Sequence, residues 1–136
     1  MPRHLRTRRR LAVLAVTATA AASLLAGCTP AATTYPVATF EVAGVETYKI
    51  ELMTPALLKH AEQLLKGEKV SAIPLGRVVR SAGVNKPWSW HIDPKTLQFA
   101  DFTIEVCDGL PSYVEDHTVT SPDYCPWSAK VIKIDR

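Results

Sequence analysis

The stretch from Thr39 to Gly67, TFEVAGVETYKIELMTPALLKHAEQLLKG, contains the two repeating patterns that decide the fold class. In its first half, apolar side chains recur at every second position on both sides of Gly44. This period is typical of half-buried strands joined by a turn, and we therefore expect a hairpin. Its alternating apolar residues are Phe40, Val42, Tyr48, Ile50 and Leu52.

The second half of the same stretch predicts a helix. Thr54 is a suitable N-cap, Pro55 occupies the first helical position, where its missing N–H costs nothing, and Gly67 ends the helix. Residues spaced three and four apart form one apolar stripe that would pack on a sheet. The stripe consists of Leu57, Leu58, Ala61, Leu64 and Leu65.

Toward the C-terminus, short apolar segments predict further strands and a short helix over residues 110–117. The predicted strands cover residues 73–80, 88–92, 101–107 and 130–134. In the third of these, we expect Phe102, Ile104 and Val106 to face the core. The pattern predicts an α+β fold, with a mostly antiparallel sheet of about five to six short strands and one main helix packed on one face. An open sandwich with the helix at its edge is the alternative.

The N-terminal region has the organisation of an export signal. Five arginines fall within the first ten residues, and residues 11–26 carry no charge. As a helix, that apolar run would span roughly 24 Å, less than a bilayer core of about 30 Å, so it fits a signal peptide better than a membrane span. Leu25 to Cys28 reads LAGC, which resembles the bacterial lipobox. We therefore expect a lipoprotein signal peptide over residues 1–27 and lipidation of Cys28.

The residues after the signal peptide predict how the domain is attached to the membrane. Residues 28–37 contain two prolines and no apolar period, as expected of an extended tether, and a single globular domain would cover residues 38–136. We expect the chain at the extracytoplasmic face of a bacterial cell membrane, attached to the membrane through lipid on Cys28. Thr7 to Leu11 also resembles a twin-arginine signal, so both export routes stay open.

The net charge changes sign once the leader is removed. The whole chain has sixteen Lys and Arg against thirteen Asp and Glu, but five of the basic residues belong to the leader. The remaining part has a formal charge of −2. No basic stripe is left to neutralise phosphates, which argues against nucleic acid as a partner.

Cysteine usage predicts one disulfide. If Cys28 carries lipid, two thiols remain, Cys107 and Cys125, in a compartment that permits disulfides. We expect them to pair, which would stabilise the domain by roughly 3 kcal/mol. A redox or metal pair would favour the close Cys-x-x-Cys spacing that these two residues lack.

A catalytic triad is the sharpest enzymatic hypothesis. Strand alternation would place Ser89, His91 and Asp93 on one face of a strand. Side chains two residues apart on a strand start roughly 6.5–7 Å apart and stand parallel, whereas a triad needs them to converge at about 3 Å. We therefore expect no catalytic residue, and a His91 that hydrogen-bonds to a turn.

Carboxylates and imidazoles are numerous enough for a metal site but lack the spacing of known ones. The sequence has no calcium-loop motif and no His-Glu-x-x-His helix, so we expect neither a metal nor a cofactor. We expect the two tryptophans of residues 88–92 in the core or at its rim. The residues that would contact a ligand are Trp88, Trp90, His91, Asp93, Glu105, Asp116 and His117.

Four short motifs carry a resemblance to a known family. In chain order they read WSWHIDP at 88–94, FTIEVCD at 102–108, YVEDH at 113–117 and CPWS at 125–128. Over about Ala38 to Ile134, they are similar to the small domain at the N-terminus of a slime-mould calmodulin-binding protein. The resemblance implies calmodulin binding and carries over no catalytic residue. A calmodulin target is a basic amphipathic helix, whereas residues 55–66 contain two lysines and need their apolar face for the core.

These observations predict a membrane-anchored binding module that is not an enzyme, with an unknown protein or small ligand at the cell envelope as its partner. Two alternatives stay open. A small envelope hydrolase or metal-dependent enzyme would use His91, Asp93, Glu105 and His117. An inhibitor of extracellular proteases would present the loop of residues 81–87.

Overall fold

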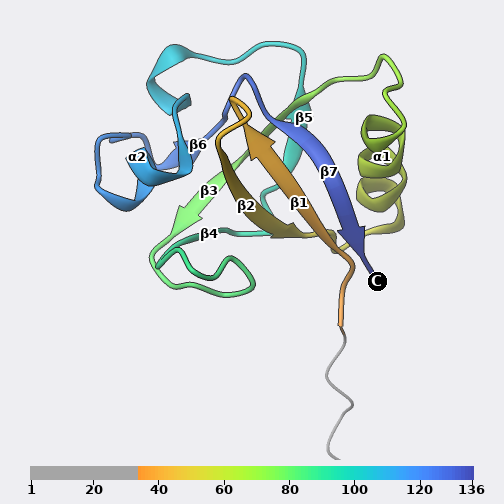
Figure 1. Ribbon diagram of the computed structural model, residues 1–136, viewed down its shortest axis with the longest axis horizontal. Coiled ribbons are helices and arrows are strands. Elements are labelled where there is room, and N and C mark those ends of the chain that lie inside the picture. Colours follow the sequence, from red (N-terminus) through yellow and green to blue (C-terminus); the bar gives the residue numbers. More distant parts are fainter. Residues whose placement is uncertain (1–33) are drawn as a thin grey trace, which may run out of the picture. The chain divides into compact units, whose positions relative to one another are not determined.

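The computed structural model describes residues 34–136 (Figure 1). The predicted signal peptide (1–27), the predicted lipidation site Cys28 and most of the predicted tether lie outside the described residues. None of the helices within the described range is long and apolar enough to cross a membrane.

The predicted hairpin is confirmed and forms part of a first antiparallel sheet. β1 (Val37–Val42) pairs with β2 (Glu46–Glu51) in a register that places Phe40 opposite Tyr48. Gly44 lies in the turn with a φ of 72°, a backbone conformation that glycine adopts without the strain a Cβ would bring. The two-residue period therefore identified both strands and their turn.

The last strand completes this sheet. β7 (Lys130–Asp135) pairs with the other edge of β1, which gives the strand order β2-β1-β7. Val37 lies opposite Asp135, so β1 begins where β7 ends. At the other end of the pair, the hydroxyl oxygen of Ser128 accepts a hydrogen bond from the backbone N–H of Ala43 at 3.0 Å. The start of β7 therefore lies beside the hairpin turn.

The predicted main helix is confirmed as α1 (Pro55–Leu65). The Oγ1 of Thr54 accepts a hydrogen bond from the backbone N–H of Leu57 at 3.2 Å, which is the expected N-cap. α1 packs against β7, and Ala61 is fully buried. Leu65 is 44% exposed although the apolar stripe predicted it in the core, because the last turn of the helix borders an open hollow next to β7.

The second antiparallel sheet is built around β3 (Ile73–Val79). Three short strands pair with β3, namely β4 (His91–Ile92), β5 (Gln98–Ala100) and β6 (Asp123–Tyr124). Gly76 in β3 has to be small, because a Cβ at this position would overlap the side chain of Ile92.

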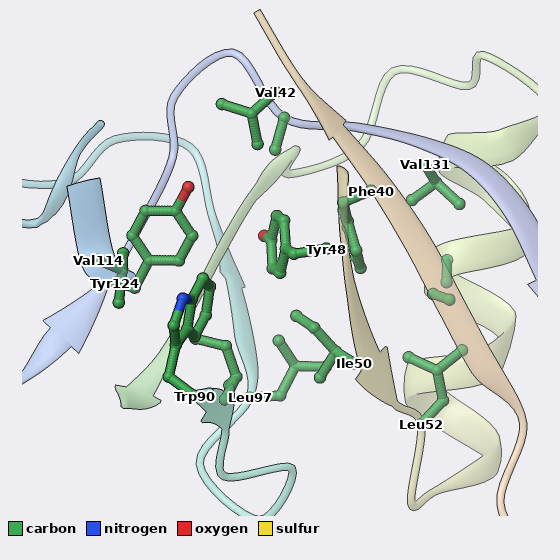
Figure 2. Packing of buried hydrophobic residues seen from close by; sticks show 14 of the residues in the cluster. Phe40, Val42, Tyr48, Ile50, Leu52, Trp90, Leu97, Val114, Tyr124 and Val131 are labelled. Atoms are coloured by element: carbon green, nitrogen blue, oxygen red, sulfur yellow. The ribbon is translucent and has the colours of Figure 1, made fainter. Parts of the chain in front are cut away.

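Aromatic side chains from both sheets meet in one core (Figure 2). Phe40 stacks on Tyr48 with 5.4 Å between the ring centroids, and Tyr124 meets both Tyr48 and Trp90 edge-on at 5.4 and 5.3 Å. Edge-to-face pairs of this kind add stability beyond the area that they bury. Burial raises the pKa of Tyr48 well above its ordinary value, so this hydroxyl stays neutral in the folded protein.

Two predicted strands need correction. The predicted strand 88–92 is reduced to the two residues of β4, because the backbone N–H of Trp88 bonds to the carbonyl oxygen of Asn85 in a turn instead of joining a sheet. The predicted strand 101–107 does not form. Asp101 lies in a bend, residues 102–104 have no regular secondary structure, and the chain then enters a single 3-10 turn, η1 (Glu105–Cys107).

The short helix expected near 110–117 forms α2 (Pro111–Glu115). Residues 34–136 thus have the predicted α+β fold, with one main helix, one disulfide and antiparallel pairing throughout. The strands number seven and are divided between two sheets.

Candidate functional site

Three large apolar side chains are exposed in the segment that sequence alternation assigned to the core. Phe102, Ile104 and Val106 are 86%, 68% and 61% exposed. The prediction that they face the core is wrong. Exposure still alternates from Phe102 to Ile104, because Thr103 between them is partly buried and lies against Trp127 rather than in the core.

Residues distant in the sequence hold the inner side of this segment. The Oγ1 of Thr103 accepts a hydrogen bond from the indole N–H of Trp127 at 2.6 Å. Cys107 is buried and forms the predicted disulfide with Cys125, so this pairing is confirmed. Thr103 is thus held and partly buried, while its neighbours Phe102 and Ile104 are exposed.

Trp127 adds a fourth exposed apolar side chain. Its backbone N–H donates to the Oδ1 of Asp108 at 2.8 Å, and its indole N–H donates to Thr103, so the residue is held at two points. The side chain is nevertheless 46% exposed. We call this group of four exposed residues the apolar strip. It consists of Phe102, Ile104, Val106 and Trp127.

Two hollows lie along the apolar strip. One, of about 190 Å³, is lined by Ile73, Asp101, Phe102, Thr103 and Trp127. The other, of about 270 Å³, is bordered by Phe102, Ile104 and Asp123. Both are smaller than the usual site for a small-molecule ligand, about 300–1,000 Å³. They suit individual side chains of a partner better than a whole small molecule.

The chain around the apolar strip is strongly acidic. Residues 96–129 contain six Asp and Glu and no Lys or Arg, whereas the rest of residues 34–136 contains eleven basic and seven acidic residues. This gap in positive charge can be read from the sequence, but it does not indicate which side chains of the segment are exposed. Apolar periodicity, on which the fold prediction rests, places Phe102, Ile104 and Val106 in the core.

The tryptophans and the histidine predicted to contact a ligand are held by internal contacts. Trp90 is fully buried in the aromatic core, and Trp88 lies at its rim, where its indole N–H donates to the carbonyl oxygen of Thr47 at 2.8 Å. The Nδ1 of His91 lies 2.5 Å from the carbonyl oxygen of Ser81. A carbonyl oxygen can only accept, so Nδ1 carries the proton, and His91 bonds to the turn as expected.

The acidic residues predicted to contact a ligand lie on separate elements. Asp93 accepts a hydrogen bond from the backbone N–H two residues later and so shapes the turn after β4. The hydroxyl and the backbone N–H of Thr118 hold the pKa of Asp116 below its ordinary value. His117 follows with a φ of 66°, and Glu105 belongs to η1.

A family model described as the BP-74 N-terminal domain matches residues 34–136. The chain belongs to this family. All four motifs that carried the resemblance lie inside the matched range, and the resemblance is therefore confirmed. No curated protein and no solved structure matches the chain.

This BP-74 N-terminal domain does not bring the residues of the enzymatic hypotheses together. Ser89 donates its hydroxyl hydrogen to Glu115, while His91 and Asp93 each bond to backbone groups of their own turns. Within residues 34–136, no histidine forms an ion pair with a carboxylate. The same part of the chain contains no group of three His, Cys, Asp or Glu that could hold a metal ion. The set of His91, Asp93, Glu105 and His117 is spread over β4, η1 and the end of α2.

Two carboxylates hold α2 of the BP-74 N-terminal domain against its neighbours. Glu46 of β2 accepts hydrogen bonds from the backbone N–H and the hydroxyl of Ser112, both at 2.8 Å. Glu115 accepts the hydroxyl of Ser89 at 2.6 Å and its backbone N–H at 3.0 Å. These two bonds, the hydroxyl first, lower the pKa of Glu115.

We expect Ser89→Ala to destabilise the domain at neutral pH and to have a smaller effect in acid. The pKa of Glu115 is lower in the folded than in the unfolded chain. Its contribution is therefore present above the unfolded pKa and is lost as the pH falls through the folded pKa. Urea unfolding of wild type and variant at about pH 7 and about pH 2.5 measures the two differences.

The matched control is Ser128→Ala, which also removes a serine hydroxyl but one that accepts from a backbone N–H rather than donating to a carboxylate. Its effect should be the same at both pH values. A Ser89→Ala effect that does not shrink in acid would show that the bond to Glu115 does not set this pH dependence.

Proposed function

We propose that this domain is a membrane-anchored, extracytoplasmic binding module that binds a partner protein through the apolar strip and catalyses no reaction. The observation that carries the proposal is the exposure of Phe102, Ile104 and Val106 within five consecutive residues. Contiguous exposed apolar patches of more than a few hundred Å² are rare on monomeric soluble domains and mark interaction sites. Burial of these side chains against a partner would supply the driving force for binding.

The rigid attachment of the strip supports this proposal. Its chain is fixed at Thr103 by the bond to Trp127 and at Cys107 by the disulfide. Trp127 is fixed in turn by Asp108. A surface that is already ordered loses less conformational entropy on binding than a loop that must first be ordered.

The position of the strip supports an anchored module that faces another protein. The described chain begins at Thr34 and enters β1, which leads over roughly 20 Å to the hairpin turn. Ser128, beside Trp127, bonds to Ala43 of that turn. Figure 1 accordingly shows the start of β7 at the end of the domain remote from where the chain enters β1. The Trp127 end of the strip therefore lies at the end of the domain opposite the entry of the chain into β1.

The strip is not suited to calmodulin, the partner that the family resemblance implies. Calmodulin targets are basic amphipathic helices. Residues 96–129 have no Lys or Arg, and α1 uses Ala61 and the adjoining apolar residues to pack on the core. A partner of different chemistry therefore fits the observations better.

Site-specific photo-cross-linking in cells that make the protein natively tests the surface. A photoreactive amino acid at Ile104 should give a discrete adduct, whereas the same group at Ile132 on β7, which is 45% exposed, should not. The Ile104 adduct should disappear in the Phe102→Ser/Val106→Ser background, because those changes remove apolar contacts on either side of the probe. Equal adducts from both positions, or an adduct that survives the double substitution, would refute the proposal.

The anchor has its own measurement. Mass spectrometry of the N-terminal peptide of the mature protein should find Cys28 as the first residue, carrying a diacylglycerol group. An unmodified Cys28, or cleavage elsewhere, would remove the membrane attachment from the proposal and leave the cross-linking result unaffected.

A further inference from the structure

We infer that the partner reaches the apolar strip with a positively charged, amphipathic peptide segment in which Lys or Arg accompanies large apolar side chains. This inference rests on the proposed function and adds the chemical class of the partner. It follows from two observations, which are the charges along the strip and the size of the hollows.

Free carboxylates border the apolar side chains of the strip. Asp101 directly precedes Phe102, and Glu105 lies between Ile104 and Val106 in the sequence. Both carboxylates belong to exposed residues, and within residues 34–136 neither makes a hydrogen bond or an ion pair. Since the whole segment 96–129 lacks Lys and Arg, the domain does not neutralise these charges with basic residues of that segment.

Other acidic residues near the strip already have partners. Asp108 accepts the backbone N–H of Trp127, and Asp123 lies 3.8 Å from the guanidinium group of Arg77 on β3. Asp101 and Glu105 are therefore the carboxylates available to an incoming cation. Opposite charges at the rim of an apolar contact raise the association rate and fix the orientation of the partner.

The hollows accept side chains rather than a flat surface. Phe102 borders both of them, with Trp127 beside one and Ile104 beside the other. A peptide with two apolar side chains spaced to enter these hollows would bury the exposed aromatic rings and bring its cations to the carboxylates. An anionic lipid surface fits less well, because it would be repelled by Asp101 and Glu105.

Peptide binding to the full-length protein tests the inference. The protein as purified from cells is held in phosphatidylcholine nanodiscs, and the probe is an 18-residue amphipathic peptide of Lys and Leu without Trp. Binding is followed by tryptophan emission, because Trp127 is the most exposed of the three tryptophans and should shift to shorter wavelength when covered. The matched probe has Glu in place of every Lys. Trp127→Phe should abolish the spectral shift.

Charge and apolar surface are then varied separately. Asp101→Asn/Glu105→Gln should weaken binding of the Lys-Leu peptide by about tenfold, the value expected for two exposed charge pairs. Glu41→Gln/Glu51→Gln changes the net charge equally on the first sheet and should change binding less than twofold. Ile104→Ser should also weaken binding. Circular dichroism and the urea midpoint establish that each variant is folded.

The outcomes separate this inference from the proposed function. Equal binding of the Glu-Leu peptide, no effect of Asp101→Asn/Glu105→Gln, or the same spectral shift with phosphatidylglycerol vesicles alone would overturn the inference. If the Ile104 cross-link is specific in cells while the Lys-Leu peptide fails, the strip binds a partner of other chemistry. If the cross-link also fails, the proposed function falls with it.

Discussion

Asn85→Leu is expected to lower the free energy of unfolding by about 3–5 kcal/mol. This figure adds the cost of leaving two buried backbone groups without partners to the loss of the two hydrogen bonds themselves. Asn85 is fully buried, and its two side-chain groups serve different elements. Its Oδ1 accepts the backbone N–H of Lys49 on β2 at 2.7 Å, and its Nδ2 donates to the carbonyl oxygen of Trp90 at 2.9 Å. Leucine fills nearly the same volume but can satisfy neither group.

Chemical unfolding of wild type and Asn85→Leu measures this loss. Lys86→Ala is the control, because Lys86 is adjacent and exposed, and a surface change of this kind should stay within about 0.5 kcal/mol of wild type. A loss below about 1 kcal/mol for Asn85→Leu would mean that water or a local rearrangement satisfies both backbone groups.

The same contacts bear on the protease-inhibitor alternative for the loop of residues 81–87. Inhibitory loops place their central side chains in solvent, where a protease can bind them. Asn85 instead points inward and joins the loop to β2 and to the chain before β4. Asn85 therefore anchors the loop to the core, although Ser81, Gly83, Lys86 and Pro87 are exposed.

Removal of the disulfide by Cys107→Ala/Cys125→Ala is expected to destabilise the domain by about 3 kcal/mol in the chain-entropy model. The two cysteines are separated by 18 positions, so the bond restricts a short loop of the unfolded chain. The folded chain is affected as well, because Cys107 ends the segment that carries Phe102, Ile104 and Val106. We therefore expect the Ile104 cross-link to weaken together with stability.

Urea unfolding with and without a reducing agent checks this prediction. Reduction should lower the midpoint of wild type and leave that of the double variant unchanged. If both proteins and both conditions give the same midpoint, the disulfide contributes no measurable stability. If Cys107 and Cys125 react with a thiol reagent in the native, unreduced protein, the pairing itself is wrong.

Local sequence signals were sufficient for the elements whose packing is local. Thr54 and Pro55 fix the start of α1 through bonds within one helical turn, and alternation from Phe40 to Leu52 fixes a hairpin whose strands are neighbours in sequence. In α1 the capping bond joins residues three positions apart, and in the hairpin each residue pairs with one on the next strand along the chain. The disulfide was predicted from the number of cysteines, because only Cys107 and Cys125 remain once Cys28 is assigned to lipidation.

The candidate site could not be predicted in the same way. Alternation predicts which of Phe102, Thr103 and Ile104 share a side, but not which side faces the core. That choice depends on Trp127, more than twenty residues away, which bonds to Thr103. The hydrophobicity of Phe102 and Ile104 predicts that these two side chains face the core. A hydrophobicity pattern does not include the hydrogen bond between Thr103 and the distant Trp127, so it predicts the wrong side. The absence of Lys and Arg from residues 96–129 identifies an acidic segment but does not indicate which of its sides faces the core.

The pairing of β1 with β7 determines when the first sheet can be completed. β1 is its central strand, yet one of its two partners consists of residues 130–135. Contacts between such distant segments raise the contact order and slow folding. In a chain that crosses a membrane N-terminus first and unfolded, β1 would present an unpaired edge until these last residues emerge. Such an edge can pair with strands of other molecules. Export in the unfolded state would therefore leave this edge open to other molecules for longer than export of the folded domain would.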